Sequence, residues 1–303
     1  MTHNDSEFVR LHNIFESIYN TYRKDIKSCP SAVQGEITKR FNQITSSRDS
    51  AKKINNFLKN MIDKQNHTVR KSSIIYMIDN LIQSSNTSVR IPKYHNCVVL
   101  IISLLSETYK DLNIIEYFVA VLFHYTPRLI PAHDAVMKGI EKEHMMKNIH
   151  PILRHNHRAI SRMYFSLLGL KINEFIPPFT ETGAQLAYRF IYNSRCYNTL
   201  SPNVIRDYAE QTLYEFFMNL YTPLNIEWSK NKNLYKFQMN EILEYYKKPC
   251  HVWEGNIVKT LPECDPLIGI VNDIINGKPE KIDIHVLSEK SKDFTNSIFE
   301  QMG

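Results

Sequence analysis

Glycine is scarce in this sequence. Eight glycines occur in 303 residues, and no two of them are separated by a single residue. Dinucleotide-binding and P-loop proteins need closely spaced glycines, because backbone N–H groups must approach the phosphates of the ligand. The sequence therefore excludes both of these nucleotide-binding motifs.

Cysteines are also few and scattered. They are Cys29, Cys97, Cys196, Cys250 and Cys264, an odd number, and none forms a Cys-x-x-Cys pair. A disulfide framework normally has an even number of cysteines, so we expect reduced cysteines in a reducing compartment. One of them could be a catalytic nucleophile, but a free cysteine is more often a small buried hydrophobic residue.

Long hydrophobic runs are missing as well. The longest mainly apolar stretch, Cys97–Leu105, is much shorter than the roughly 18 to 20 apolar residues that a membrane-spanning helix needs. Residues 1–20 lack the basic start and apolar block of a secretory signal. We therefore expect a soluble protein of the cytosol or nucleus.

Positive charge is in excess, but only in the first quarter of the chain. Residues 1–72 contain 13 Lys and Arg against 7 Asp and Glu, whereas the remaining residues contain 24 of each. Such a local surplus favours an acidic partner, which can be a nucleic acid, a polyphosphate or an acidic protein surface. The alternative is that these side chains only keep the protein soluble.

Helical periodicity is the dominant pattern. Apolar residues between positions 8 and 22 recur at spacings of three and four, and Pro30 follows as a helix stop. Similar stripes predict helices at residues 37–44, 54–62, 74–82, 92–108, 112–124, 134–146, 151–168, 181–193, 201–220, 227–247 and 266–275. Strand alternation is weak and is clearest at Lys281–Val286.

These elements predict an all-α fold. Consecutive helices joined by short loops should pack as antiparallel pairs, and stacked pairs form a helical solenoid. We expect residues 1–30 to form an N-terminal helix and residues 31–303 to form a single helical-repeat domain.

Histidines are the first candidates for chemistry. His144, His150, His155 and His157 fall within one short segment. No His-Glu-x-x-His motif or paired carboxylate accompanies them, so a solvated surface is favoured over a metal site.

Three arginines make a better candidate site. Arg154, Arg158 and Arg162 are spaced four apart on a predicted helix, so they share one face. Guanidinium groups form bidentate pairs with phosphates or carboxylates, and we predict a partner-binding role for the three. The alternative is a solvated face with salt bridges to neighbouring helices.

Several stretches resemble the C-terminal domain of the mRNA-export mediator GLE-one, a block similar to the HEAT-like middle domain of translation-initiation scaffolds. They are Ile74–Gln83, Val98–Leu105, Phe118–Pro131, Arg158–Phe165 and Gly269–Gly277. The resemblance covers about residues 30–280 and depends on the order and spacing of these segments.

The resemblance implies a HEAT-repeat-like fold with no catalysis of its own. Members of the family act at the cytoplasmic face of the nuclear pore, where they bind and stimulate a DEAD-box ATPase of mRNA export. A phenylalanine-glycine nucleoporin is a further expected partner. The rival hypothesis is a scaffold of the translation-initiation type, which binds a helicase or RNA without a role in export.

Inositol hexakisphosphate is the small ligand that the resemblance implies. The family's basic pocket falls here on Arg40 with Lys39 beside it, on Asn80 and Gln83, and on His124 with Tyr125. Only Lys39 and Arg40 are firmly basic. Six phosphates need several cations at close range, so we expect weak binding of this ligand. No metal is expected.

Overall fold

The computed structural model describes residues 3–45, 47–83, 94–126, 129, 152–194, 250–254 and 257–261. Its contacts group the chain into two compact units, Met1–Leu224 and Asn225–Gly303. The division into domains made from the sequence stays a prediction. Helices predicted at 134–146, 201–220, 227–247 and 266–275, and the strand at 281–286, lie outside the described residues.

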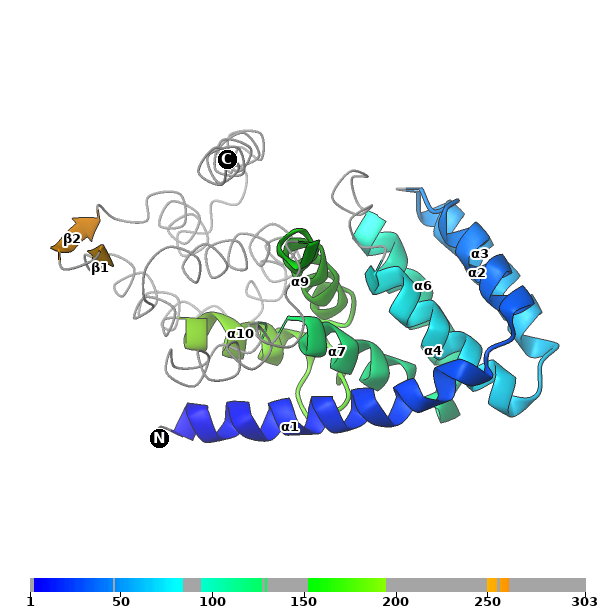
Figure 1. Cartoon of the computed structure of the whole chain (residues 1–303), viewed down its shortest axis with the longest axis horizontal. Coiled ribbons are helices and arrows are strands. Elements are labelled where there is room, and N and C mark those ends of the chain that lie inside the picture. The colour runs from blue at the N-terminus through cyan, green and yellow to red at the C-terminus, as the bar shows by residue number, and fades with distance from the viewer. Residues whose placement is uncertain are drawn as a thin grey trace. The chain divides into compact units, whose positions relative to one another are not determined.

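The described part of the first unit is helical, as predicted (Figure 1). Its elements are α1 (His3–Arg23), the 3₁₀ turn η1 (Lys24–Ser28), α2 (Ser31–Phe41), α3 (Arg48–Asp63), α4 (His67–Gln83), α6 (Tyr94–Thr108), η2 (Lys110–Leu112), α7 (Ile114–Tyr125), α9 (Ile152–Leu170) and α10 (Gly183–Ser194). The all-α prediction is confirmed for this unit.

α2 and α4 lie side by side and run in the same direction. Cys29 Sγ, just before α2, lies 3.7 Å from Ser73 Oγ on α4, and farther along both helices the Asn80 amide donates to Thr38 Oγ1 at 3.3 Å. α4 also packs on α7, while α3 packs on α6 and α6 on α9. Two layers result, α2–α4–α7 and α3–α6–α9, which is the arrangement expected of stacked antiparallel pairs.

The first helix covers α7. The rings of Phe15 and Phe123 stack with centroids 4.4 Å apart, and those of Tyr22 and Tyr117 stack at 5.1 Å. From Phe15 to Tyr22 along α1, the stacking partner on α7 moves back from Phe123 to Tyr117, so α1 and α7 are antiparallel. Phe179, from the loop between α9 and α10, completes this aromatic cluster against Phe15.

The predicted start of α7 is two residues early. Leu112 belongs to η2, and Asn113 has a φ of 48°, in the left-handed region. Asparagine tolerates this conformation better than most residues. The backbone therefore turns at Asn113, and the helix begins at Ile114.

A β-hairpin in the second unit was not predicted. β1 (Cys250–Glu254) pairs antiparallel with β2 (Ile257–Leu261), and Trp253 lies opposite Val258. The signal was present, since β-branched and aromatic residues flank the dipeptide Gly255-Asn256, which is typical of a two-residue hairpin loop.

Candidate partner-binding surface

Asn80, one of the positions implied for the polyphosphate, joins α4 to α2. The Asn80 amide donates to Thr38 Oγ1 at 3.3 Å and to the Tyr76 hydroxyl at 3.2 Å. Thr38 and Tyr76 also share a hydrogen bond of 3.2 Å. The three side chains are neutral, so this cluster joins α2 to α4 without adding positive charge.

Arg40 points towards α3. Its guanidinium carbon lies 3.8 Å from the centroid of the Phe57 ring, and its Nη1 donates to Gln43 Oε1 at 3.1 Å. Lys39, the next residue along α2, is exposed. A cation–π contact of this kind leaves the charge available to a partner on the open side of the guanidinium.

His124 lies on α7 and faces α1. Its Nδ1 is 2.7 Å from Glu16 Oε1, and its ring stacks on Tyr19 with centroids 3.7 Å apart. An anion near His124 would therefore meet the Glu16 carboxylate as well. The side chain of Gln83 lies outside the described residues.

Together these positions fit inositol hexakisphosphate poorly. The Asn80 amide is bound to neutral hydroxyls, and His124 is paired with an acid. Only Lys39 and Arg40 add firm positive charge, and these two cations are far fewer than the phosphates of the ligand. The assignment of the four residues as a ligand site stays a prediction.

Among the described residues, most of the exposed positive charge lies on η1, α2 and α3 and directly after α3. Exposed lysines and arginines there are Lys24, Lys27, Lys39, Arg48, Lys52, Lys53 and Lys64, which we call the basic set. No member of the basic set forms an ion pair within the part of the chain that the structure describes. Their charges face solvent and are available to a partner.

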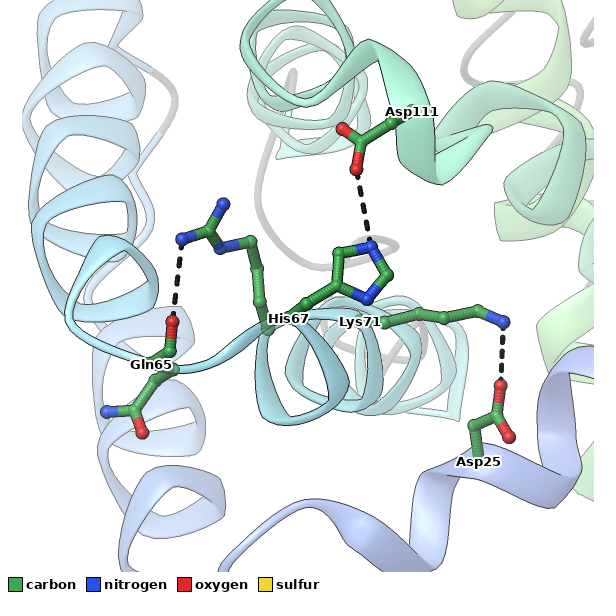
Figure 2. Close-up of polar contacts among 6 residues, drawn as sticks. Asp25, Gln65, His67, Lys71 and Asp111 are labelled. Atoms are coloured by element: carbon green, nitrogen blue, oxygen red, sulfur yellow. Dashed lines mark hydrogen bonds and ion pairs between the residues drawn. The ribbon is translucent and has the colours of Figure 1, made fainter.

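Several acids near the basic set are already occupied within the chain. Figure 2 shows the contacts of Lys71 with Asp25 and of His67 with Asp111. Lys71 Nζ lies 2.8 Å from Asp25 Oδ2, and His67 Nε2 lies 3.4 Å from Asp111 Oδ2. Asp63 accepts a hydrogen bond of 2.7 Å from the Tyr109 hydroxyl. These contacts tie neighbouring helix ends together, and they leave the surplus of positive charge on the outside.

Of the three arginines in the predicted stripe, the structure describes the side chain of Arg162. Arg162 is half-buried on α9, between the buried residues Ser161 and Met163. The side chains of Arg154 and Arg158 lie outside the described residues. Their role in partner binding stays a prediction.

The enzyme hypotheses gain no support. Burial raises the pKa of the Cys29 and Cys97 thiols, so both favour the unreactive protonated form. Among the residues that the structure describes, no three His, Cys, Asp or Glu side chains gather as metal ligands. The histidines at 144, 150, 155 and 157 lie where side chains are not described. Within the same described ranges, no helix combines the length and apolarity of a membrane span.

The fold has a relative among solved structures. A chain of the Saccharomyces cerevisiae complex in which the C-terminal domain of Dbp5 is bound to Gle1 and IP6, both proteins carrying a single substitution, is similar to this chain with a TM-score of 0.61. The two are 14% identical, and the match covers 81% of this chain and 87% of the other. This likeness shows that the helical fold is shared.

Comparisons of sequence lead to a family. No curated protein matches the chain. A family model described as GLE1-like protein matches residues 10–162, which include α2, α3, α4, α6, α7 and most of α1. This match spans half of the chain and confirms the resemblance found in the sequence. The chain belongs to the GLE1-like protein family.

Proposed function

We propose that this protein is an mRNA-export factor that binds a DEAD-box ATPase at the cytoplasmic face of the nuclear pore and stimulates its cycle. The observation that carries the proposal is the family match over residues 10–162, because this region contains the whole basic set. The fold shared with a chain of a Dbp5–Gle1 complex supports the same partner class.

The basic set supplies the means of contact. Arg48 and Lys52 are four apart on α3, so they lie on neighbouring turns of one exposed face. Exposed charges of one sign steer an oppositely charged partner and orient it on contact. The partner surface that fits α2 and α3 is therefore an acidic face of the ATPase.

Stimulation would follow from differential binding. A rigid stack of helices that binds one conformation of the ATPase more tightly shifts the population towards that conformation. The favoured state would hold the two lobes of the ATPase apart or release RNA. ATP hydrolysis itself belongs to the partner, and we assign no catalytic residue to this chain.

Inositol hexakisphosphate contributes little in this proposal. The yeast complex contains IP6, whereas the positions that the sequence resemblance implies for this ligand here include, besides Lys39 and Arg40, a neutral hydrogen-bonded cluster and a histidine paired with an acid. Direct charge contacts would replace the ligand. A phenylalanine-glycine nucleoporin remains a proposed second partner that would hold the protein at the pore.

Binding to the C-terminal domain of the cognate ATPase tests the contact. The double variant Lys52→Glu/Lys53→Glu should weaken binding about tenfold, since it changes two exposed charges that attract the partner into charges that repel it. Lys110→Glu, an equally exposed change on η2, is the matched control and should retain full affinity. Equal affinity of all three proteins would contradict the role of the basic set.

A further inference from the structure

A buried carboxyl group lies where α4, α7 and α1 approach one another. Asp79 on α4 is 3% exposed. Its Oδ1 accepts a hydrogen bond of 2.7 Å from the Tyr117 hydroxyl, and Tyr117 is itself buried on α7. The second oxygen, Oδ2, is buried and has no hydrogen-bond partner. An ionised carboxylate in this position would leave half of its acceptor capacity unused, which is costly in a dry interior.

Helices α7 and α1 contribute the polar and charged groups around Asp79. Among the described residues, Tyr117 of α7 acts on Asp79 through its hydrogen bond, and His124 of α7 and Arg23 of α1 act through their charges. Arg23 donates from Nη1 to the Tyr19 hydroxyl, and Glu16 of α1 holds His124. The charges of Arg23 and His124 lower the pKa of Asp79, but burial has the larger effect, and the pKa is raised.

We propose that Asp79 is a proton-dependent lock that fastens α1 to the α4–α7 pair. When Asp79 is protonated, the Tyr117 hydrogen bond is kept and no charge is buried beneath α1. When the proton leaves, a negative charge remains buried beside Tyr117, with no hydrogen-bond donor to its second oxygen. Opening of α1 then becomes easier, because it lets water reach the carboxylate.

The sign of the pH effect follows from the direction of the shift. The pKa of Asp79 is higher in the closed state than in an open, solvated state. The stabilisation of the closed state is therefore complete below the ordinary aspartate pKa, and it is lost as the pH rises through the raised value. Each unit of difference between the two pKa values corresponds to about a tenfold change in the opening equilibrium.

Hydrogen exchange of the α1 amides in the full chain tests the proposal. After correction for the intrinsic exchange rate, we expect the opening of α1 in the wild-type protein to increase as the pH rises from about 4 to about 8, by about tenfold for each unit by which the pKa of Asp79 is raised. Asp79→Asn keeps the size of the side chain and removes its charge. This variant should depend less on pH than wild type, because among the described contacts only the His124–Glu16 pair would still titrate between α7 and α1, and it should be at least as well protected as wild type at the higher pH.

A matched control separates the lock from a general loss of stability. Asp63 accepts an equally short hydrogen bond, 2.7 Å from the Tyr109 hydroxyl, but it is exposed, and it lies on α3, which packs on α2, α4 and α6. Asp63→Asn should therefore leave the pH response of α1 unchanged. Tyr117→Phe removes the donor to Asp79 and should increase the response, since that hydrogen bond supports the ionised form.

Two results would overturn the proposal. One is α1 exchange that does not change with pH in the wild-type protein relative to Asp79→Asn. The other is weaker protection of Asp79→Asn than of wild type at every pH, which would show that Asp79 works as a paired carboxylate. If Asp79→Asn does not fold, the comparison of Tyr117→Phe with wild type still decides the matter.

Discussion

The Phe15 ring of α1 lies within 5° of parallel to the Phe123 ring of α7, with centroids 4.4 Å apart. Both rings are buried, and Phe179 approaches each of them edge-on. One aromatic cluster therefore joins the first helix, the central helix and the loop after α9. These stacked and edge-on contacts anchor α1 on α7.

Phe15→Ala should lower the free energy of unfolding by about 3–5 kcal/mol, because it removes a fully buried ring and leaves a cavity. Urea denaturation followed by circular dichroism measures the change. Ser17→Ala, at an exposed position of the same helix, should change the stability by less than about 0.5 kcal/mol. A similar loss in both variants would show that α1 is not anchored by Phe15.

Gly183→Ala should be destabilising by about 1–3 kcal/mol, which is typical of an overpacked site. The N–H of Gly183 donates to the carbonyls of Lys171 and Glu174, and an added Cβ would lie 2.5 Å from the Lys171 carbonyl oxygen. Gly35, inside α2, has no atom within 4 Å of an added Cβ. Gly35→Ala should therefore raise the free energy of unfolding by about 0.5–1 kcal/mol. Thermal unfolding of both variants beside the wild-type protein measures the two opposite changes in stability.

Much of the helical stack could be predicted from the sequence. Leu11, Phe15 and Tyr19 follow the 3.6-residue period, and the structure buries all three. The turn at Asn113 could not be predicted, because the apolar pattern of α7 continues upstream into Leu112. The helix begins only at Ile114 because of the backbone conformation of Asn113, and the spacing of apolar residues does not indicate that conformation.

The candidate surface was less predictable than the fold. The surplus of positive charge was visible in the composition of residues 1–72. The place of this charge on the surface could not be predicted, because it depends on which acidic side chains are paired within the chain. Asp25, for example, is paired with Lys71. The pairing of His124 with Glu16 joins residues more than a hundred positions apart, and no local pattern indicates such a contact.

Calorimetry with inositol hexakisphosphate should give weak binding that decreases as salt is added. The reason is that few firm cations lie at the positions implied for this ligand, and exposed charges are screened by added ions. Glu16→Gln removes the carboxylate beside His124 and should raise the affinity. Nanomolar affinity of the wild-type chain would show that a different set of residues forms the site.

A fluorescently tagged chain should label the nuclear rim in cells. We expect this location because the proposed function places the protein at the cytoplasmic face of the pore. Diffuse cytosolic fluorescence would favour the alternative of a translation-type scaffold. The Lys52→Glu/Lys53→Glu variant helps to separate the partners, since a nucleoporin contact outside the basic set would keep this variant at the rim.

RNA-stimulated ATP turnover by the cognate DEAD-box ATPase tests the central claim most directly. The rate should be measured with increasing amounts of this chain until it no longer changes. We predict a higher turnover rate at saturation, and a weaker response at equal concentration for Lys52→Glu/Lys53→Glu than for Lys110→Glu. An unchanged rate at a concentration where binding is complete would contradict the proposed function.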